Sequence, residues 1–413
     1  MINLLKYNPH WEKGFRYPFE KKREVFNFLL KSLSKRQIVE IVGLRRTGKT
    51  TLLFQVINHL LENKIEPFKI WYFTFDEEKV SLDELFKEFS LQTQIDFRKE
   101  KLYIFLDEIQ KLPDFQAQLK VYYDLYPNLK FYLSGSTSLF IKKKIQDSLA
   151  GRIMEAYLLP LNFKEYLYFK GKSELIEKPH VFAYEIEKEF EIFLESQFIE
   201  SIFITERKDR KEYFYTIMKK IVFEDIPQIF SLDNPEILWW LLKIIAQQPG
   251  ILLDYQSLSK EIGISNKTLS LYLFYLEEAF LLHKVFNFSR NLITSERKLK
   301  KFYLSSPSFS WALTDFCDKG KLVENFIISC KNYKFFWRDS YKHEIDFVEV
   351  RNNQIIPVEI KYKDEVQDKE LKNLWIFSKK FNCSEAIFLK KTLEEKRRIF
   401  KDLTIKELPV YLA

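Results

Sequence analysis

The stretch from Gly43 to Thr50, GLRRTGKT, constrains the fold more than any other part of this sequence. It follows the apolar run 38–42 and precedes a run that begins at Thr51. A strand that ends in GxxxxGKT and turns directly into a helix offers backbone N–H groups and a helix N-terminus to a polyphosphate. We expect Lys49 to neutralise the β- and γ-phosphates and Thr50 to bind Mg²⁺. The expected nucleotide contacts are Gly43, Leu44, Arg45, Arg46, Thr47, Gly48, Lys49, Thr50 and Thr51.

The run after this loop has the periodicity of a helix. Its apolar residues recur in pairs every four positions, which forms one helical face. These residues are Leu52, Leu53, Val56, Ile57, Leu60 and Leu61. A chance glycine turn before an ordinary helix is the alternative, but the spacing, the Lys-Thr ending and both flanks agree with a phosphate-binding loop.

Length and composition limit the class of protein. A chain of 413 residues exceeds one compact core, so several domains are expected. Lys and Arg (66) exceed Asp and Glu (58), giving a net charge of +8, which is compatible with nucleic acid without establishing it. The 3 cysteines show no CxxC spacing, so neither a disulfide framework nor a zinc site is expected. We find no signal peptide or membrane span and expect a cytoplasmic protein.

A second acidic element completes the expected site. The apolar run 102–106 ends in Asp107-Glu108, and we expect Asp107 to hold the Mg²⁺ shell and Glu108 to polarise the attacking water. Carboxylates after strands are common, so this pair gains its weight from lying downstream of the loop. The next strand ends in a polar segment, where Ser136 is either a γ-phosphate sensor or an ordinary turn hydroxyl.

Two further features have open interpretations. Arg152 follows Gly151 on the side expected to sense phosphate, so it is either a transition-state arginine or a solvated charge. Near the N-terminus, Trp11 or Tyr17 could stack on a purine, although packing against the core is the more common role of aromatic residues. A helix is expected from about residue 20 to 32.

These motifs as a set resemble a large family of archaeal and bacterial P-loop ATPases of the AAA+/STAND type with a C-terminal domain of unknown function. The resemblance covers about residues 35–170 and implies an α/β ATPase core that binds, and hydrolyses, ATP with Mg²⁺. The motifs that carry it are GLRRTGKT, Leu106-Asp107-Glu108-Ile109-Gln110, Gly135-Ser136, Ala150-Gly151-Arg152 and the segment LPLNFKEY from Leu159 to Tyr166.

The middle region ends in a helix-turn-helix pattern. Gly263 marks the turn and Ser265 the N-cap of a second helix, and the spacing resembles a winged helix at about 250–290. Its polar residues could meet DNA, or the module could be a lid or spacer on the ATPase. Basic residues nearby favour nucleic acid slightly, although charge runs are usually solvated faces. They are Arg290, Arg297, Lys298, Lys300 and Lys301.

The C-terminal region contains a constellation of acids. Strand alternation places Glu344 with Asp346 on one face and Glu359 with Lys361 on one face, so a hairpin would bring Asp346, Glu359 and Lys361 together. Two carboxylates and a lysine can hold a divalent cation that activates water toward a phosphodiester. The pattern resembles the PD-(D/E)XK nuclease superfamily, with Glu324 as the helical acid, although the proline before the Asp is missing. A charged surface hairpin is the alternative.

The sequence therefore predicts an α/β protein with three parts: a P-loop ATPase domain with an N-terminal arm (1–172), a helical and winged-helix region (173–295), and a PD-(D/E)XK-like domain (296–413). One function is an ATPase acting on DNA. The other is a STAND-type regulatory switch whose C-terminal domain is a non-catalytic binding module, with a homo-oligomer or a protein as partner.

Overall fold

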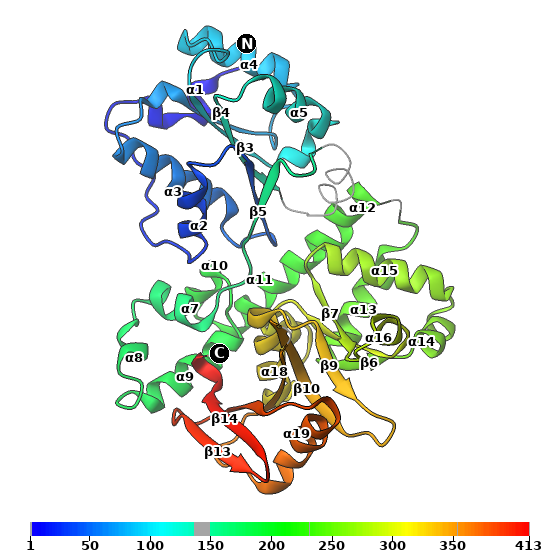
Figure 1. The fold of residues 1–413 in the computed structure, drawn as a ribbon. Coiled ribbons are helices and arrows are strands. Elements are labelled where there is room, and N and C mark those ends of the chain that lie inside the picture. The colour runs from blue at the N-terminus through cyan, green and yellow to red at the C-terminus, as the bar shows by residue number, and fades with distance from the viewer. Residues whose placement is uncertain (1, 136–148, 231, 353, 413) are drawn as a thin grey trace. The chain divides into compact units, whose positions relative to one another are not determined.

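The structure is a computed structural model that describes residues 2–135, 149–230, 232–352 and 354–412. It divides into two compact units, Met1–Leu159 and Pro160–Ala413 (Figure 1). The first unit thus ends before residue 172, the expected end of the first domain.

A five-stranded parallel sheet with the order β2-β3-β4-β1-β5 forms the centre of the first unit. Parallel neighbours require crossover connections, which the helices between the strands supply. The strands are β1 (Ile38–Val42), β2 (Ile70–Thr74), β3 (Leu102–Asp107), β4 (Leu129–Gly135) and β5 (Ile153–Tyr157). The helices are α1 (Leu4–Tyr7), α2 (Phe26–Ser32), α3 (Lys49–Glu62), α4 (Leu82–Thr93) and α5 (Phe115–Leu125), with 3-10 turns at Pro9–Trp11, Pro67–Lys69 and Ile109–Lys111.

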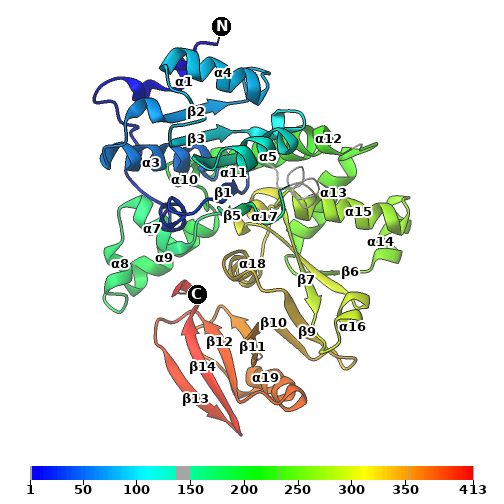
Figure 2. The ribbon, with the colours of Figure 1, turned by 45° about the horizontal axis from the view of Figure 1, so that its top comes forward.

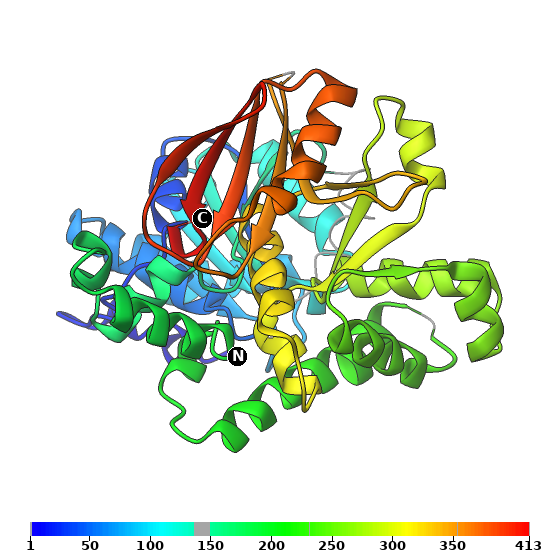
Figure 3. The same ribbon diagram turned by 90° about the horizontal axis from the view of Figure 1, so that it is seen from below.

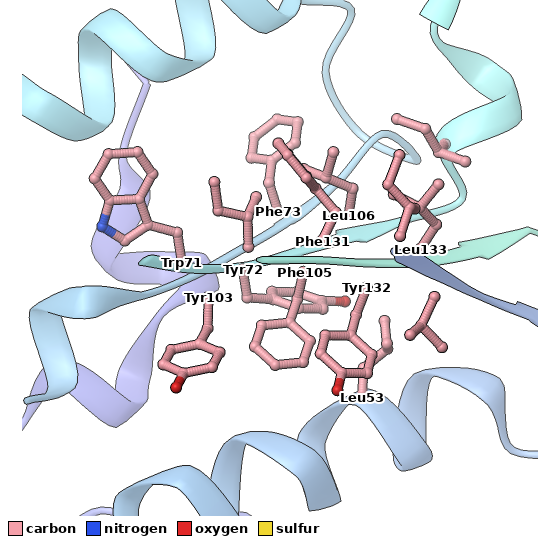
Figure 4. Packing of buried hydrophobic residues seen from close by; sticks show 14 of the residues in the cluster. Leu53, Trp71, Tyr72, Phe73, Tyr103, Phe105, Leu106, Phe131, Tyr132 and Leu133 are labelled. Atoms are coloured by element: carbon pink, nitrogen blue, oxygen red, sulfur yellow. The ribbon is translucent and has the colours of Figure 1, made fainter. Parts of the chain in front are cut away.

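Helices cover both faces of this sheet, because adjacent strand residues point in opposite directions. Trp71 stacks on Phe89 of α4 with ring centroids 4.5 Å apart, whereas Tyr72 contacts Phe54 of α3 at 4.9 Å. Figure 4 shows this alternation, with Tyr72 on the same side of the sheet as Leu53. Helices α3 and α4 therefore lie on opposite faces (Figure 2).

The N-terminal arm protects the edge of the sheet at β2. Asn8 imitates a neighbouring strand: its Oδ1 accepts from the Tyr72 N–H at 2.7 Å, and its Nδ2 donates to the Tyr72 carbonyl at 3.0 Å. Trp11 Nε1 donates to the carbonyl of Ile70 at 3.0 Å. Unpaired edge strands invite pairing with other chains, so these side chains close a vulnerable edge.

The aromatic residues of the arm belong to the core. Tyr17 stacks on Phe54 with ring centroids 4.2 Å apart, and Trp11 packs edge-on against Phe89. The packing interpretation thus fits both residues better than purine stacking does. The helix expected from residue 20 begins only at Phe26. The carbonyl of Lys21 instead accepts from Gln55 of α3 at 2.8 Å, which ties this segment to the neighbouring helix.

A nine-stranded mixed sheet runs through the second unit, in the order β13-β14-β12-β11-β10-β9-β7-β8-β6. Its strands are β6 (Ile251–Leu253), β7 (Leu282–Asn287), β8 (Lys300–Leu304), β9 (Phe335–Arg338), β10 (Glu344–Arg351), β11 (Gln354–Lys361), β12 (Glu385–Lys390), β13 (Lys396–Phe400) and β14 (Leu403–Pro409). Its helices are α7 (Phe163–Lys170), α8 (Glu174–Glu177), α9 (Ala183–Leu194), α10 (Ile199–Ile202), α11 (Arg207–Lys220), a π-helical turn (Ile221–Asp225), α12 (Ile226–Ile229), α13 (Pro235–Gln247), α14 (Tyr255–Ile262), α15 (Asn266–Glu278), α16 (Leu292–Arg297), α17 (Pro307–Leu313), α18 (Lys319–Lys331) and α19 (Asp368–Phe381), with a 3-10 turn at Val410–Leu412.

The strands β7 and β8 connect the middle and C-terminal regions. They pair antiparallel with each other, and β7 also pairs parallel with β9. The boundary expected at 295/296 falls within α16, between β7 and β8, so these two paired strands would belong to different domains. The sheet joins the two regions into one folded body.

The helix-turn-helix pattern is confirmed. Gly263 ends α14 with φ 78°, and the Ser265 hydroxyl caps α15 by accepting from the Thr268 N–H at 3.0 Å. The exposed side of α15 also carries Leu271 and Phe274, which are apolar. Among the described residues, every helix is too short or too polar to span a bilayer.

Helices α18 and α19 pack on opposite faces of the second sheet. Helix α19, the orange helix beside the C-terminal strands in Figure 3, packs through Leu371, Leu374 and Phe377 on the face that carries Ile345. Asp346, the next residue of β10, points to the other face, where α18 contacts β8 and β11. The acidic constellation therefore lies under α18.

Candidate functional site

The phosphate-binding loop joins β1 directly to α3. Gly48 adopts φ 98° at the N-cap of α3, a left-handed conformation that favours glycine. Arg46 also has a positive φ of 65°. Residues held in such sparsely populated conformations cluster at ligand sites, so the backbone geometry of the loop agrees with its expected role.

Gly43 is required for a different reason. A Cβ atom at this position would lie 2.3 Å from the carbonyl oxygen of Leu158. The N–H of Leu158 donates to the carbonyl of Val42 at 2.7 Å, which fixes the segment after β5 against the start of the loop. Only glycine fits beneath that segment.

Polar side chains hold the loop from within. Lys49 Nζ donates to the carbonyls of Gly43 and Leu44 at 3.0 and 2.9 Å, and its side chain is buried. Thr47 Oγ1 donates to the Leu44 carbonyl at 2.8 Å. The ammonium group therefore lies inside the curve of the loop, where a phosphate would be held.

Asp107 is the centre of a network of hydroxyl groups. Its Oδ2 accepts from Thr50 Oγ1 at 2.7 Å and from the Tyr72 hydroxyl at 3.0 Å. Its Oδ1 accepts from Ser134 Oγ and from the N–H of Glu108. The side chain is only 3% exposed.

The network lies at one edge of the sheet. Val42 of β1 is in register with Gly135 of β4, and Thr74 of β2 with Asp107 of β3. Because carboxyl ends of parallel strands share an edge, the loop and the acidic residues meet there. Thr50 and Asp107 are in direct contact at that point, 2.7 Å apart, and a hydroxyl and a carboxylate are oxygen groups of the kind that Mg²⁺ binds.

Glu108 has an unusual backbone. Its φ is 51°, and its Oε2 accepts from Gln110 Nε2. A left-handed glutamate immediately after a buried strand redirects the chain at the carboxyl edge of the sheet. This geometry agrees with a residue placed to orient water.

The other predicted contacts are placed as follows. Arg45 is half-buried, Arg46 is exposed, and Thr51 lies in the first turn of α3. Ser136 lies outside the described residues. Ser134, two positions before it, donates to Asp107.

Sequence reasoning missed two residues beside the loop. Arg23 donates to the carbonyl of Thr47 at 3.3 Å and to that of Leu159 at 2.8 Å, bracing the loop from the N-terminal arm. Tyr72 lies within an apolar strand, where it is indistinguishable from a core aromatic. Neither residue belongs to a motif. For Tyr72, the alternation along β2 was the only signal in the sequence.

The structure contradicts a catalytic role for Arg152 within its own chain. Ile38, at the start of β1, is in register with Ile153, so Arg152 lies at the amino edge of the sheet, opposite the loop. Its guanidinium binds both carboxylate oxygens of Asp124 at 2.9 and 3.1 Å. The sequence could not reveal which end of β5 faces the loop, because that depends on where the strand begins.

The C-terminal acids converge as the hairpin predicted. Strands β10 and β11 pair antiparallel with Phe347 opposite Val358, so the same register sets Asp346 opposite Glu359. Lys361 Nζ lies 2.7 Å from Glu359 Oε1 and 3.8 Å from Asp346 Oδ2. All three residues thus form one cluster.

Two observations on this cluster fit a cation. Glu359 Oε2 is buried and has no hydrogen-bond partner among the described residues. Burial, together with the charge of Asp346, raises the pKa of Glu359 to about 8, although Lys361 opposes the shift. An added positive charge between the carboxylates would favour the ionised form. A positive charge beside Asp346 and Glu359 would therefore be stabilised.

Glu324 differs from this pair in its partners. Its carboxylate accepts from the Tyr303 hydroxyl and contacts Lys301 at 3.3 Å and Lys321 at 2.7 Å. Burial alone would raise the pKa of Glu324, but Lys301 and Lys321 lower it to about 2. The Glu324 carboxylate is thus paired with two lysines of the chain itself, and its expected role as a metal ligand stays a prediction.

Lys301 belongs to the basic residues that either favour nucleic acid slightly or form a solvated face, and its burial agrees with neither. Its side chain is buried, and Nζ also lies 2.7 Å from Glu344 Oε1. Among the described residues, no three or more His, Cys, Asp or Glu side chains form a group that could hold a metal. A metal at Asp346 and Glu359 would depend on ligands beyond these two.

Three known families match successive parts of the chain. Residues 35–167 match the AAA domain family, which includes the loop, Asp107 and Glu108. Residues 201–319 and 319–411 match two domains of unknown function (DUF8612 and DUF4143). With its parallel sheet, the first unit is a P-loop ATPase core, and the AAA match supports ATP binding.

Similar proteins occur in an archaeon and a bacterium. The chain is 28% identical over 376 residues to an uncharacterized protein of Methanocaldococcus jannaschii, covering 85% of this chain and 81% of the relative. A second protein of that archaeon is 27% identical, with 69% and 65% covered. A Haemophilus influenzae protein is 24% identical, with 81% and 84% covered. Their names state no activity.

Solved structures show more distant similarity. A Walker-type ATPase of Pyrococcus abyssi aligns with 72% of this chain and 97% of its own, at 17% identity and a TM-score of 0.47. The ORC2 protein of Aeropyrum pernix in its ADP form aligns with 73% and 94%, at 15% identity and a TM-score of 0.35. At this level of similarity, neither bears on the site or substrate of this chain.

The position of Arg152 generates a test. Arg152→Ala should leave nucleotide affinity unchanged in dilute protein, because the side chain lies at the opposite edge of the sheet from the loop. Arg23→Ala is the matched arginine variant and should weaken binding, since Arg23 braces Thr47. Titration with a fluorescent ATP analogue measures both. Weaker binding by the Arg152 variant would contradict this placement.

Proposed function

From the P-loop ATPase core, we propose that this protein binds ATP with Mg²⁺ and hydrolyses it at the loop of residues 43–50. The observation that carries the proposal is the direct contact between Thr50 and Asp107, 2.7 Å apart. Two polar groups separated by 57 positions in sequence meet at the end of the loop, which is where the ion of a phosphoryl-transfer site is held.

Each residue has a distinct task in this proposal. Lys49 exchanges its contacts with the Gly43 and Leu44 carbonyls for phosphate oxygens, and the N–H groups at the start of α3 bind the same anion. Thr50 and Asp107 would hold Mg²⁺, which neutralises charge that develops on the phosphates. Glu108 accepts the proton of the attacking water or orients that water.

The role of Arg152 is restricted by its position. If it acts in hydrolysis, it does so on the site of a neighbouring copy, because in its own chain it lies at the other edge of the sheet. Ser136 stays a proposed sensor of the γ-phosphate.

A second candidate function concerns the C-terminal cluster. The convergence of Asp346, Glu359 and Lys361, together with the unpartnered Glu359 oxygen, favours a divalent cation there and, with the resemblance to nucleases, action on DNA. Two observations argue against this function. The Glu324 carboxylate is paired with Lys301, and Lys301 is itself buried between Glu324 and Glu344.

The helix-turn-helix region adds little support for DNA. The hairpin of β7 and β8 after α15 suits a winged helix. However, the exposed side of α15 offers Lys267 as a basic residue beside apolar Leu271 and Phe274. A regulatory ATPase whose C-terminal unit binds a partner without cleaving DNA is therefore the competing proposal.

The first experiment tests nucleotide binding. Lys49→Ala should abolish the rise in melting temperature that ATP produces, because binding to the native state alone stabilises it. Lys120→Ala, which removes an exposed lysine on α5, is the matched control and should keep the full rise. Undiminished protection of the Lys49 variant would overturn the assignment of the loop.

A second experiment separates binding from hydrolysis. Glu108→Gln should bind ATP as the natural chain does and lose turnover by roughly 100-fold or more, the usual contribution of a positioned base. Phosphate release is the measurement, with Glu62→Gln, an exposed acid at the end of α3, as control. Retained hydrolysis would mean that another residue orients the water.

A third experiment addresses the C-terminal cluster. In the Lys49→Ala background without nucleotide, Mn²⁺ binding followed by electron paramagnetic resonance should show a site that Glu359→Gln removes and Glu365→Gln, a change at an exposed acid, leaves intact. Plasmid incubated with the same proteins and Mn²⁺ then reports cleavage. Absence of both would remove the nuclease candidate and favour the binding module.

A further inference from the structure

The Tyr72 hydroxyl donates to the same Asp107 oxygen as Thr50, but from a different element of the fold. Thr50 belongs to α3 and the loop, whereas Tyr72 belongs to β2, at 3.0 Å from Asp107 Oδ2. The two donors differ in what holds them.

Resting on the proposed ATPase function, we propose that Tyr72 is a positioning residue that holds the Asp107 carboxylate oriented toward the metal of the nucleotide. It does not touch substrate. It acts through Asp107, as partners of metal-binding carboxylates do when they fix the direction of the ligand oxygen.

Tyr72 is itself unusually well fixed. Both its backbone N–H and its carbonyl are bound by the Asn8 side chain, at 2.7 and 3.0 Å. On the other side β2 pairs with β3, with Tyr72 in register with Phe105. The ring packs against Phe54 of α3 with centroids 4.9 Å apart. The hydroxyl is thus aimed at Asp107 by backbone and ring together.

Burial gives this contact its weight. Tyr72 is 5% exposed and Asp107 3%, so the hydrogen bond lies away from solvent. A hydroxyl that donates to a carboxylate in such surroundings is stronger than one between neutral groups. Without it, the Asp107 carboxylate would keep Thr50, Ser134 and the Glu108 N–H as donors but lose the one that is anchored in the edge strand.

A tyrosine that only fills the core is the competing explanation, and Tyr132 is the matched case. It lies on the same face of the sheet in the same core (Figure 4), and its hydroxyl contacts Ser32 Oγ at 2.9 Å and the Leu29 carbonyl at 3.1 Å, away from Asp107. Tyr132→Phe therefore removes a buried hydroxyl from this core without touching the proposed metal ligand.

The experiment measures the Mg²⁺ dependence of ATP hydrolysis by the full chain. Tyr72→Phe should raise the Mg²⁺ concentration for half-maximal turnover by about 10-fold, the lower range for loss of a metal's outer partner, while ATP binding without Mg²⁺ stays unchanged. Tyr132→Phe should lower the melting temperature and leave the Mg²⁺ dependence as it was. An unchanged Mg²⁺ dependence in folded Tyr72→Phe would overturn the proposal.

Failure of this proposal differs from failure of the proposed function. A natural chain that does not hydrolyse ATP would refute the ATPase function, whereas an active natural chain and an unchanged Mg²⁺ dependence in Tyr72→Phe would refute only the role of Tyr72. If Tyr72→Phe does not fold, 3-fluorotyrosine at position 72 keeps the hydroxyl and reports the contact directly. Its ¹⁹F resonance should shift when Mg²⁺ is added to the ADP complex and should not shift in the Asp107→Asn variant. No shift on adding Mg²⁺ would contradict the proposal.

Discussion

The buried carboxylate of Asp107 connects the phosphate-binding loop to the sheet, and the geometry of the first unit depends on it. Thr50 reaches it from α3, Tyr72 from β2 and Ser134 from β4. A buried charge is tolerated only where hydrogen bonds replace water, so these donors make the site possible as well as shaping it. Because the donors come from separate elements, the whole α/β arrangement must form before the loop and the acid can act together.

The second unit is organised by paired charges of a different kind. Lys301 of β8 lies between Glu324 of α18 and Glu344 of β10, so a buried ammonium group joins the hairpin of the middle region to the C-terminal strands. Removing one partner of such a network leaves a buried charge uncompensated, which is strongly destabilising. Burial raises the pKa of both Asp346 and Glu359, although Lys361 opposes the shift. The two groups of acids thus differ in their lysine partners, which are Lys301 and Lys321 for Glu324 and Lys361 for Asp346 and Glu359.

Local pattern predicted the elements whose chemistry lies in contiguous residues. The loop between β1 and α3, the acids after β3, the Gly263 turn and the hairpin that brings Lys361 to Glu359 all follow from spacing and alternation. Features that depend on tertiary placement were not predictable. Lys301 looks like part of a solvated basic run until its strand is paired, Arg152 looks catalytic until the end of β5 is known, and Tyr72 looks like any core aromatic. In each case the deciding fact is which edge or face of a sheet the side chain occupies.

A structure of the chain with Mg²⁺ and a non-hydrolysable ATP analogue tests the central claim most directly. We expect Lys49 Nζ to leave the carbonyls of Gly43 and Leu44 and to contact the phosphates. Thr50 and Asp107 should face the ion, and Tyr72 should keep its contact with Asp107. Nucleotide bound elsewhere, or a Lys49 that stays on the loop carbonyls while ATP is present, would contradict it.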